Sequence, residues 1–212
     1  MAPPKNKGDE KILSYLDVVM RRSNLDILRG PHYLNDRIIE FYFAHLASLS
    51  PSPRALVLPP SISFWLTNCP DPQSLHQSTD PLRLPDRDLI LFPVNSNLDV
   101  TVAGGGSQWS LLVYCREAGE FLHHDSCRSA NRCHAERLFN AVSGFVDDGS
   151  EPPRFVEGFT PQQTNGHDCR RTLSSSGFTH WRRSAAVCRC SSLSKMVPPI
   201  FVPYMWSYVK PL

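Results

Sequence analysis

The chain has 212 residues, of which 41% are hydrophobic and 20% are charged, and its formal net charge is +2. A chain of this length and composition folds as one globular domain with a sizeable core, which excludes a disordered or fibrous protein. The sequence shows no secretory signal and no apolar run of membrane-spanning length. We therefore expect an intracellular protein of the cytoplasm or nucleus that does not contact a membrane.

The charges are distributed unevenly along the chain. All 20 acidic residues lie at or before Asp168, whereas residues 170–212 contain seven Lys or Arg and no acid. The first 169 residues therefore carry a net charge of −5 and the rest +7. This break separates a folded domain over 11–169 from an atypical basic tail, rich in Pro and Ser, over 170–212. Residues 1–10 are polar and are expected to form a flexible N-terminus.

The first part of the chain contains one element of undecided type and two predicted helices. Residues 12–19 are short and apolar, and fit either a strand or a helical turn. Farther along, apolar residues recur at the spacing of one helix face: Ile38, Ile39, Tyr42, Phe43 and Leu46. Asn35 or Asp36 can cap this helix, which ends by Pro51. A second helical segment is predicted over residues 61–68.

Strands dominate the middle of the chain. Residues 88–94 form a continuous apolar run typical of an interior strand, and two more strands are predicted over 109–114 and 120–124. The short turn at residues 117–119 joins the last two as an antiparallel hairpin. A helix over 131–145 and a strand over 154–157 follow. This order predicts an α+β fold around a central mixed sheet flanked by helices.

The cysteines form no regular framework. They occupy seven positions: Cys69, Cys115, Cys127, Cys133, Cys169, Cys188 and Cys190. This pattern favours a reduced protein with mostly structural thiols. Cys127, Cys133 and His134 with the Cys188–Cys190 pair have ligand types that suit zinc, but their spacing matches no standard zinc motif. We expect no metal and no organic cofactor.

One short segment contains the main candidate catalytic residues. Gln163 lies six residues before Cys169, with Asn165-Gly166 and Asp168 between them. This spacing is typical of a nucleophilic cysteine and the amide that donates to the oxyanion formed during attack on a carbonyl. The Asn-Gly pair predicts a turn that folds Gln163 back over the thiol.

Several upstream segments support the same interpretation. They are residues 13–17 (LSYLD), 33–36 (YLND), 92–95 (FPVN), 104–114 (GGGSQWSLLVY) and 121–126 (FLHHDS). Over about residues 12–169 the chain resembles the ubiquitin-like-modifier cysteine proteases of the sentrin-specific and adenain-like kind. Their small single-domain deneddylase branch, which removes the Nedd or Rub type of modifier, is the most similar. The resemblance implies a single domain of the papain-like clan.

The family's triad runs His, Asp, Cys along the chain. The resemblance therefore implies Cys169 as the nucleophile, Asp125 as the residue that orients the base, and Gln163 as the oxyanion donor. At the position of the family's histidine the chain has Gln108. An amide neither accepts a proton usefully near neutral pH nor stabilises a thiolate, so we expect activity several powers of ten lower.

Other histidines offer a replacement base only if a loop rearranges. His123 and His124 precede Asp125 on a predicted strand, where one shares the face of Asp125 and the other does not. His167 precedes the nucleophile by two residues. The alternative function is a catalytically inactive pseudo-protease that still binds the modifier.

The resemblance also implies a binding site for the modifier's tail. Trp109 and Tyr33 match aromatic lids that enclose a diglycine, because only residues without Cβ fit between two flat rings. Asp36, next to Asn35, lies at the position where members of the family contact a basic residue of the modifier. Core packing is the alternative role of both rings. The expected partners are a Nedd-type modifier and its conjugates, such as cullins.

The tail departs from the family. After Cys169 the family has glycine and an apolar helix, whereas here Arg170 and Arg171 stand where a core helix begins. Two unpaired cations are not tolerated in a core. We therefore hypothesise that altered splicing or a reading-frame shift changes the coding sequence here. The seven tail cations have no stacking residues or known module to organise them, so we do not expect nucleic-acid binding.

Overall fold

A five-stranded sheet organises the domain in the computed structural model, which describes residues 10–29, 32–49, 52–102, 105–146, 149, 151–160 and 162. Its strands are β3 (Ala55–Val57), β4 (Leu89–Asn95), β5 (Trp109–Cys115), β6 (Glu120–His124) and β7 (Arg154–Glu157), in that spatial order. The inner pairs β4–β5 and β5–β6 are antiparallel. The outer pairs β3–β4 and β6–β7 are parallel, so the predicted mixed sheet is confirmed.

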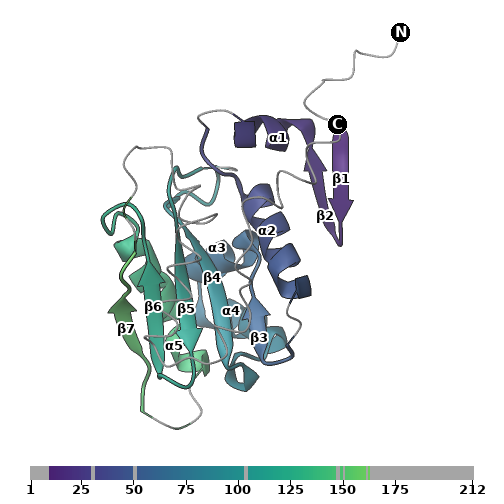
Figure 1. Cartoon of the computed structure of the whole chain (residues 1–212). Coiled ribbons are helices and arrows are strands. Elements are labelled where there is room, and N and C mark those ends of the chain that lie inside the picture. Colours follow the sequence, from purple (N-terminus) through teal and green to yellow (C-terminus); the bar gives the residue numbers. More distant parts are fainter. Residues whose placement is uncertain are drawn as a thin grey trace.

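Helices cover both faces of this sheet (Figure 1). The helices are α1 (Arg22–Arg29), α2 (Asp36–Leu49), α3 (Pro60–Asn68), α4 (Pro72–Thr79) and α5 (Arg132–Val146), with short 3-10 turns η2 (Asp80–Leu82) and η3 (Leu84–Asp86). All seven residues of β5 and six of the seven in β4 are buried. Strands covered on both faces read as continuous apolar runs, which explains the pattern of these segments.

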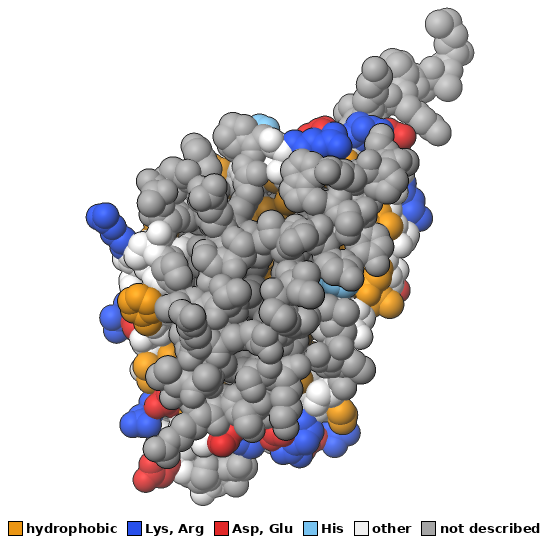
Figure 2. Space-filling model, viewed as in Figure 1, with side chains coloured by type: hydrophobic (Ala, Val, Ile, Leu, Met, Phe, Trp, Pro, Cys, Tyr) orange, Lys and Arg blue, Asp and Glu red, His pale blue; other side chains and the backbone are white. Residues whose placement is uncertain are grey.

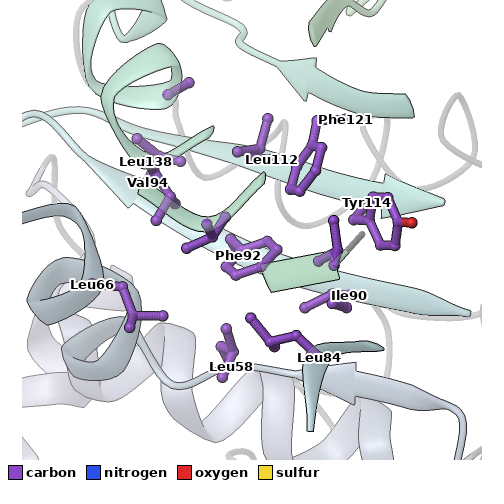
Figure 3. Packing of buried hydrophobic residues seen from close by; sticks show 13 residues of the cluster. Leu58, Leu66, Leu84, Ile90, Phe92, Val94, Leu112, Tyr114, Phe121 and Leu138 are labelled. Carbon is purple, nitrogen blue, oxygen red and sulfur yellow. The ribbon is translucent and has the colours of Figure 1, made fainter. Parts of the chain in front are cut away.

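The core has two layers, one on each face. On one face, α2 contributes Ile39, Tyr42, Phe43 and Leu46, which pack on Leu89, Leu91, Trp109, Leu111 and Val113. On the other face, Leu66 of α3 and Leu138 of α5 pack with alternate strand residues, among them Ile90, Phe92, Leu112 and Phe121 (Figure 3). Successive strand residues point to opposite faces, so each strand serves both layers.

The N-terminal segment left open by the sequence forms a hairpin. Strands β1 (Lys11–Tyr15) and β2 (Val18–Arg21) pair antiparallel around a turn at Leu16, whose φ is 49°. The Tyr15 ring makes edge contacts with the rings of Phe41 and His45, with centroids 5.6 and 5.8 Å away. These contacts fasten the hairpin to α2.

The predicted helices and strands lie within a few residues of the observed ones. Asn35 caps α2, because its Oδ1 accepts a hydrogen bond from the backbone N–H of Ile38 at 3.1 Å. Helices α1 and α4 and strand β3 were missed. The signal for α4 was present: Asp71 accepts from the Ser74 N–H at 2.8 Å and Pro72 follows at the first helical position.

Charged side chains of both signs lie around the edge of the face shown in Figure 2. Several form exposed ion pairs, such as Arg22 with Glu10 and Arg154 with Glu120. Exposed pairs of this kind contribute little to stability. Among the helices of the described ranges, none has the length and apolar character to cross a bilayer.

Candidate active site

Asp125 lies directly after β6 and is 4% exposed. Its Oδ1 accepts a hydrogen bond from the backbone N–H of Cys127, and its Oδ2 accepts one from the N–H of Asn131, both at 2.8 Å. Hydrogen bonds from N–H groups to a carboxylate offset the free energy of burying it. The fold therefore holds this carboxylate in one orientation at the end of a central strand.

The loop after Asp125 has an unfavourable backbone. Arg128 and Ser129 both have positive φ, 48° and 60°, a region that residues with a Cβ seldom adopt. Besides the two bonds to the carboxylate, the Arg128 N–H donates to Oε1 of Gln162 at 2.6 Å. Asp125 and Gln162 together maintain the loop that leads into α5.

Gln108 directly precedes β5, and its backbone is held from two sides. Its N–H donates to Ser96 Oγ at 3.1 Å, and its carbonyl accepts from the Ser96 N–H at 3.1 Å. The same carbonyl accepts from Nδ2 of Asn131 at 3.2 Å. Since Asn131 also donates to Asp125, one residue connects position 108 with the buried carboxylate. The fold thus brings together two sequence-predicted site residues.

Trp109 is 5% exposed and packs in the core layer beneath α2. Its indole Nε1–H donates to the backbone carbonyl of Leu34 at 2.9 Å, across 75 residues of sequence. This bond holds the segment before α2 beside the start of β5. In that segment Tyr33 is 41% exposed and Asp36 is exposed, while Asn35 uses its side chain as the helix cap. Trp109 is therefore a core residue, and it also anchors the predicted binding segment.

The two histidines before Asp125 lie on opposite faces. His124 pairs with Leu111 of the α2-side core layer, and its Nδ1 lies 3.2 Å from Thr160 Oγ1. His123 is fully buried on the other face, which Asp125 shares. Its Nε2 lies 2.9 Å from Ser110 Oγ and its Nδ1 lies 3.0 Å from Glu157 Oε1. Both rings therefore have partners, and those of His123 join β6 to β5 and β7.

His123→Phe is expected to lower the free energy of unfolding by about 1–3 kcal/mol, because it leaves the buried Ser110 hydroxyl without the His123 ring and removes one hydrogen bond of Glu157. Urea unfolding followed by tryptophan fluorescence measures this loss. The same change at the exposed His32 is the control and should have little effect. Equal losses at both positions would contradict a structural role for the His123 bonds.

No protein-family model matches the chain. The chain is 53% identical over 161 residues to NEDD8-specific protease 1 of Arabidopsis thaliana, and the match covers 76% of this chain and 71% of the relative. The chain belongs to the ubiquitin-like-modifier cysteine protease family. It is also 32% identical over 164 residues to human sentrin-specific protease 8, with 76% of each chain covered.

Solved structures show the same fold. A structure of the SUMO protease Ulp1 with its catalytic cysteine oxidised to a sulfenic acid gives a TM-score of 0.58 at 18% identity, covering 86% of this chain and 78% of that one. The Ulp1 protease domain in complex with Smt3 gives 0.57 at 15% identity, covering 97% and 79%. The predicted α+β fold is therefore confirmed as that of the ubiquitin-like-modifier proteases.

Part of the family's site lies outside the described residues. Cys169, Gln163 and His167 fall there, as do the Asn165-Gly166 turn and the whole basic tail. Gln162 is described: its Nε2 donates to the carbonyls of Asp125 at 3.1 Å and Thr160 at 2.8 Å. The residue just before the predicted oxyanion donor is thus bound to the segment that bears the carboxylate.

Sequence reasoning missed the contributions of Asn131, Ser96 and Gln162. Gln162 had a weak signal as the first of two adjacent glutamines, whereas the other two had none. For the zinc alternative, no group of three or more potential metal ligands occurs within the described part of the chain, which includes Cys127, Cys133 and His134. Cys188 and Cys190 lie outside it.

Proposed function

We propose that this chain is, by descent, a cysteine isopeptidase and C-terminal hydrolase of the deneddylase type. It would cleave after the diglycine tail of a Nedd- or Rub-type modifier, with activity impaired by Gln108. The supporting observation is the connection of residue 108 to the Asp125 carboxylate through Asn131. A general base and the carboxylate that orients it require this proximity. The relative that is 53% identical bears the name NEDD8-specific protease, which favours this modifier.

In the proposed chemistry the Cys169 thiolate attacks the carbonyl carbon of the modifier's last glycine, and the Gln163 amide donates to the resulting oxyanion. The family's base takes the thiol proton and later gives it to the leaving amine, while the carboxylate orients it. Asp125 is buried and hydrogen-bonded in a way that suits this orienting role. Gln108 supplies no proton acceptor of useful basicity, so the proton-transfer step is the one that is impaired.

A pseudo-protease is the second candidate, and Gln108 favours it. The Trp109–Leu34 bond holds the predicted binding segment in place without a base. Tyr33, Asn35 and Asp36 would then bind the modifier's tail and the protein would not cut it. Modifier-bearing proteins such as cullins, in the cytoplasm or nucleus, are the proposed partners of either form.

The two functions are separated by measuring binding and cleavage together. Calorimetry with the free Nedd-type modifier tests binding by the chain as given, with ubiquitin and a sumo-type modifier as comparisons. Release of a C-terminal fluorophore from the same three modifiers tests cleavage, with Cys169→Ala as the inactive control. Selective binding without cleavage supports the pseudo-protease, whereas cleavage lost in Cys169→Ala supports the enzyme. Absence of both with every modifier would contradict both functions.

Trp109→Phe is expected to weaken binding of the Nedd-type modifier about 5-fold, because it removes an indole N–H worth roughly 1 kcal/mol while keeping an aromatic ring. Calorimetry measures the change in Kd. Trp65→Phe is a matched control, since Trp65 Nε1 donates to Ser78 Oγ at 2.9 Å on α3 and α4. A similar weakening in both variants would show that the Leu34 bond has no special role in binding.

A further inference from the structure

Asn131 makes hydrogen bonds to three separate segments of the chain. It lies directly before α5 and is fully buried. Its backbone N–H donates to Asp125 Oδ2 at 2.8 Å. Its side-chain Nδ2 donates to the carbonyl of Gln108 at 3.2 Å and, more weakly, to that of Val94 at 3.4 Å. One residue therefore touches the end of β4, the start of β5 and the carboxylate after β6.

The amide of Asn131 is not placed there for packing alone. Its Oδ1 is buried and has no hydrogen-bond partner among the residues that the structure describes. An unpaired buried acceptor costs free energy that an apolar side chain of the same shape would avoid. The two carbonyls fix which end of the amide faces them, because only the NH₂ group can donate. The position thus uses the N–H donors of asparagine in spite of the unpaired oxygen.

We propose that Asn131 is a positioning residue, which aligns position 108, where the family has its base, with the Asp125 carboxylate. Its backbone fixes Asp125, and its side chain fixes the backbone of residue 108, so the separation of the two is set by the geometry of one residue. The inference rests on the proposed function, because only a base at position 108 would use this alignment.

The two connections can be separated by mutation. A substitution at Asn131 keeps the backbone N–H that binds Asp125. It removes the side-chain amide, which binds the carbonyl of residue 108 and, more weakly, that of Val94. The Gln108 carbonyl retains its bond from Ser96, so the strand start remains attached to the end of β4. We therefore expect a small displacement of residue 108 relative to Asp125 and no loss of the fold.

The test uses the full chain carrying Gln108→His, with and without Asn131→Leu, which has a similar shape and no donor. The readout is an NMR titration of the imidazole introduced by Gln108→His, identified by difference from the chain as given. With Asn131 present, the nearby Asp125 carboxylate should raise the pKa of that imidazole above the ordinary value of about 6.5. With Asn131→Leu the pKa should return toward the ordinary value. Asn131→Ala provides a second variant.

Steady-state kinetics give an independent readout. Because a displacement of about 1 Å can cost on the order of 100-fold in rate, Asn131→Leu should lower kcat about 10- to 100-fold for fluorophore release from the Nedd-type modifier. The KM should change little, since the binding segment is held by Trp109. Thr79→Val is the control: Thr79 is buried and donates to backbone carbonyls within α4, so its loss should affect stability only.

The outcomes are distinct. An imidazole pKa and a kcat unchanged by Asn131→Leu would overturn the inference. So would unfolding of both Asn131 variants while Thr79→Val stays folded, because Asn131 would then be structural. If Gln108→His has no activity but its imidazole pKa still depends on Asn131, the positioning role stands and the proposed activity of this chain fails for a cause outside positions 108, 125 and 131.

Discussion

Gln108→His is expected to raise the rate of fluorophore release from a Nedd-type modifier by on the order of 10⁴-fold, as expected for restoring one member of a catalytic triad. The reason lies in the surroundings of position 108. Its backbone is held by Ser96 and Asn131, and Asn131 also binds the Asp125 carboxylate. A histidine introduced there therefore has a backbone that is already held by hydrogen bonds, so activity requires little further change in the structure.

The measurement compares kcat/KM of the chain as given, Gln108→His and Gln108→Asn. The asparagine variant changes the side chain without adding a base and should show no gain. Comparable activity in the chain as given and in Gln108→His would mean that another base, such as His167, has been recruited. Absence of activity from both would mean that the cause of inactivity lies outside position 108. The basic tail after Cys169 would then be the first segment to test. Reading the transcript across the Cys169 codon then tests the splice or frame hypothesis.

Asp125→Ala is expected to lower the free energy of unfolding by about 3–6 kcal/mol, since each hydrogen bond to a charged group contributes roughly 1.5–3 kcal/mol and two are lost. The backbone N–H groups of Cys127 and Asn131 would lose their acceptor inside the protein. The positive-φ residues Arg128 and Ser129 would also lose support. The same substitution should abolish the rate gained by Gln108→His, because nothing then orients the imidazole.

Urea unfolding and kinetics in the Gln108→His chain measure the two effects of Asp125→Ala. Asp99→Ala is a matched control, because Asp99 also accepts two hydrogen bonds, from the Thr101 N–H at 2.8 Å and from Thr101 Oγ1 at 2.6 Å, but is exposed. Water replaces those bonds after mutation, so the loss of stability should be much smaller. Similar losses at the two positions would show that burial of Asp125 has no special importance.

Regular periodicity made much of the fold predictable. The helical stripe after Asn35 and the apolar runs of β4 and β5 are long enough for one period to dominate. Short elements did not have this advantage. In β3 three residues are too few to show a period, and α1 has polar residues in most positions. These elements form because neighbouring elements cover them, which is information carried by the tertiary structure.

The sequence by itself determined the family, because the identities and spacing of residues such as Asp125 and Cys169 can be read directly along the chain. It also showed the departure at position 108, which needs only the identity of one residue. Only the tertiary structure decided that Asn131 joins position 108 to Asp125, and that Trp109 binds Leu34 across 75 residues. Hydrogen bonds between distant segments depend on how strand ends meet in space, and no residue pattern along the chain encodes that meeting.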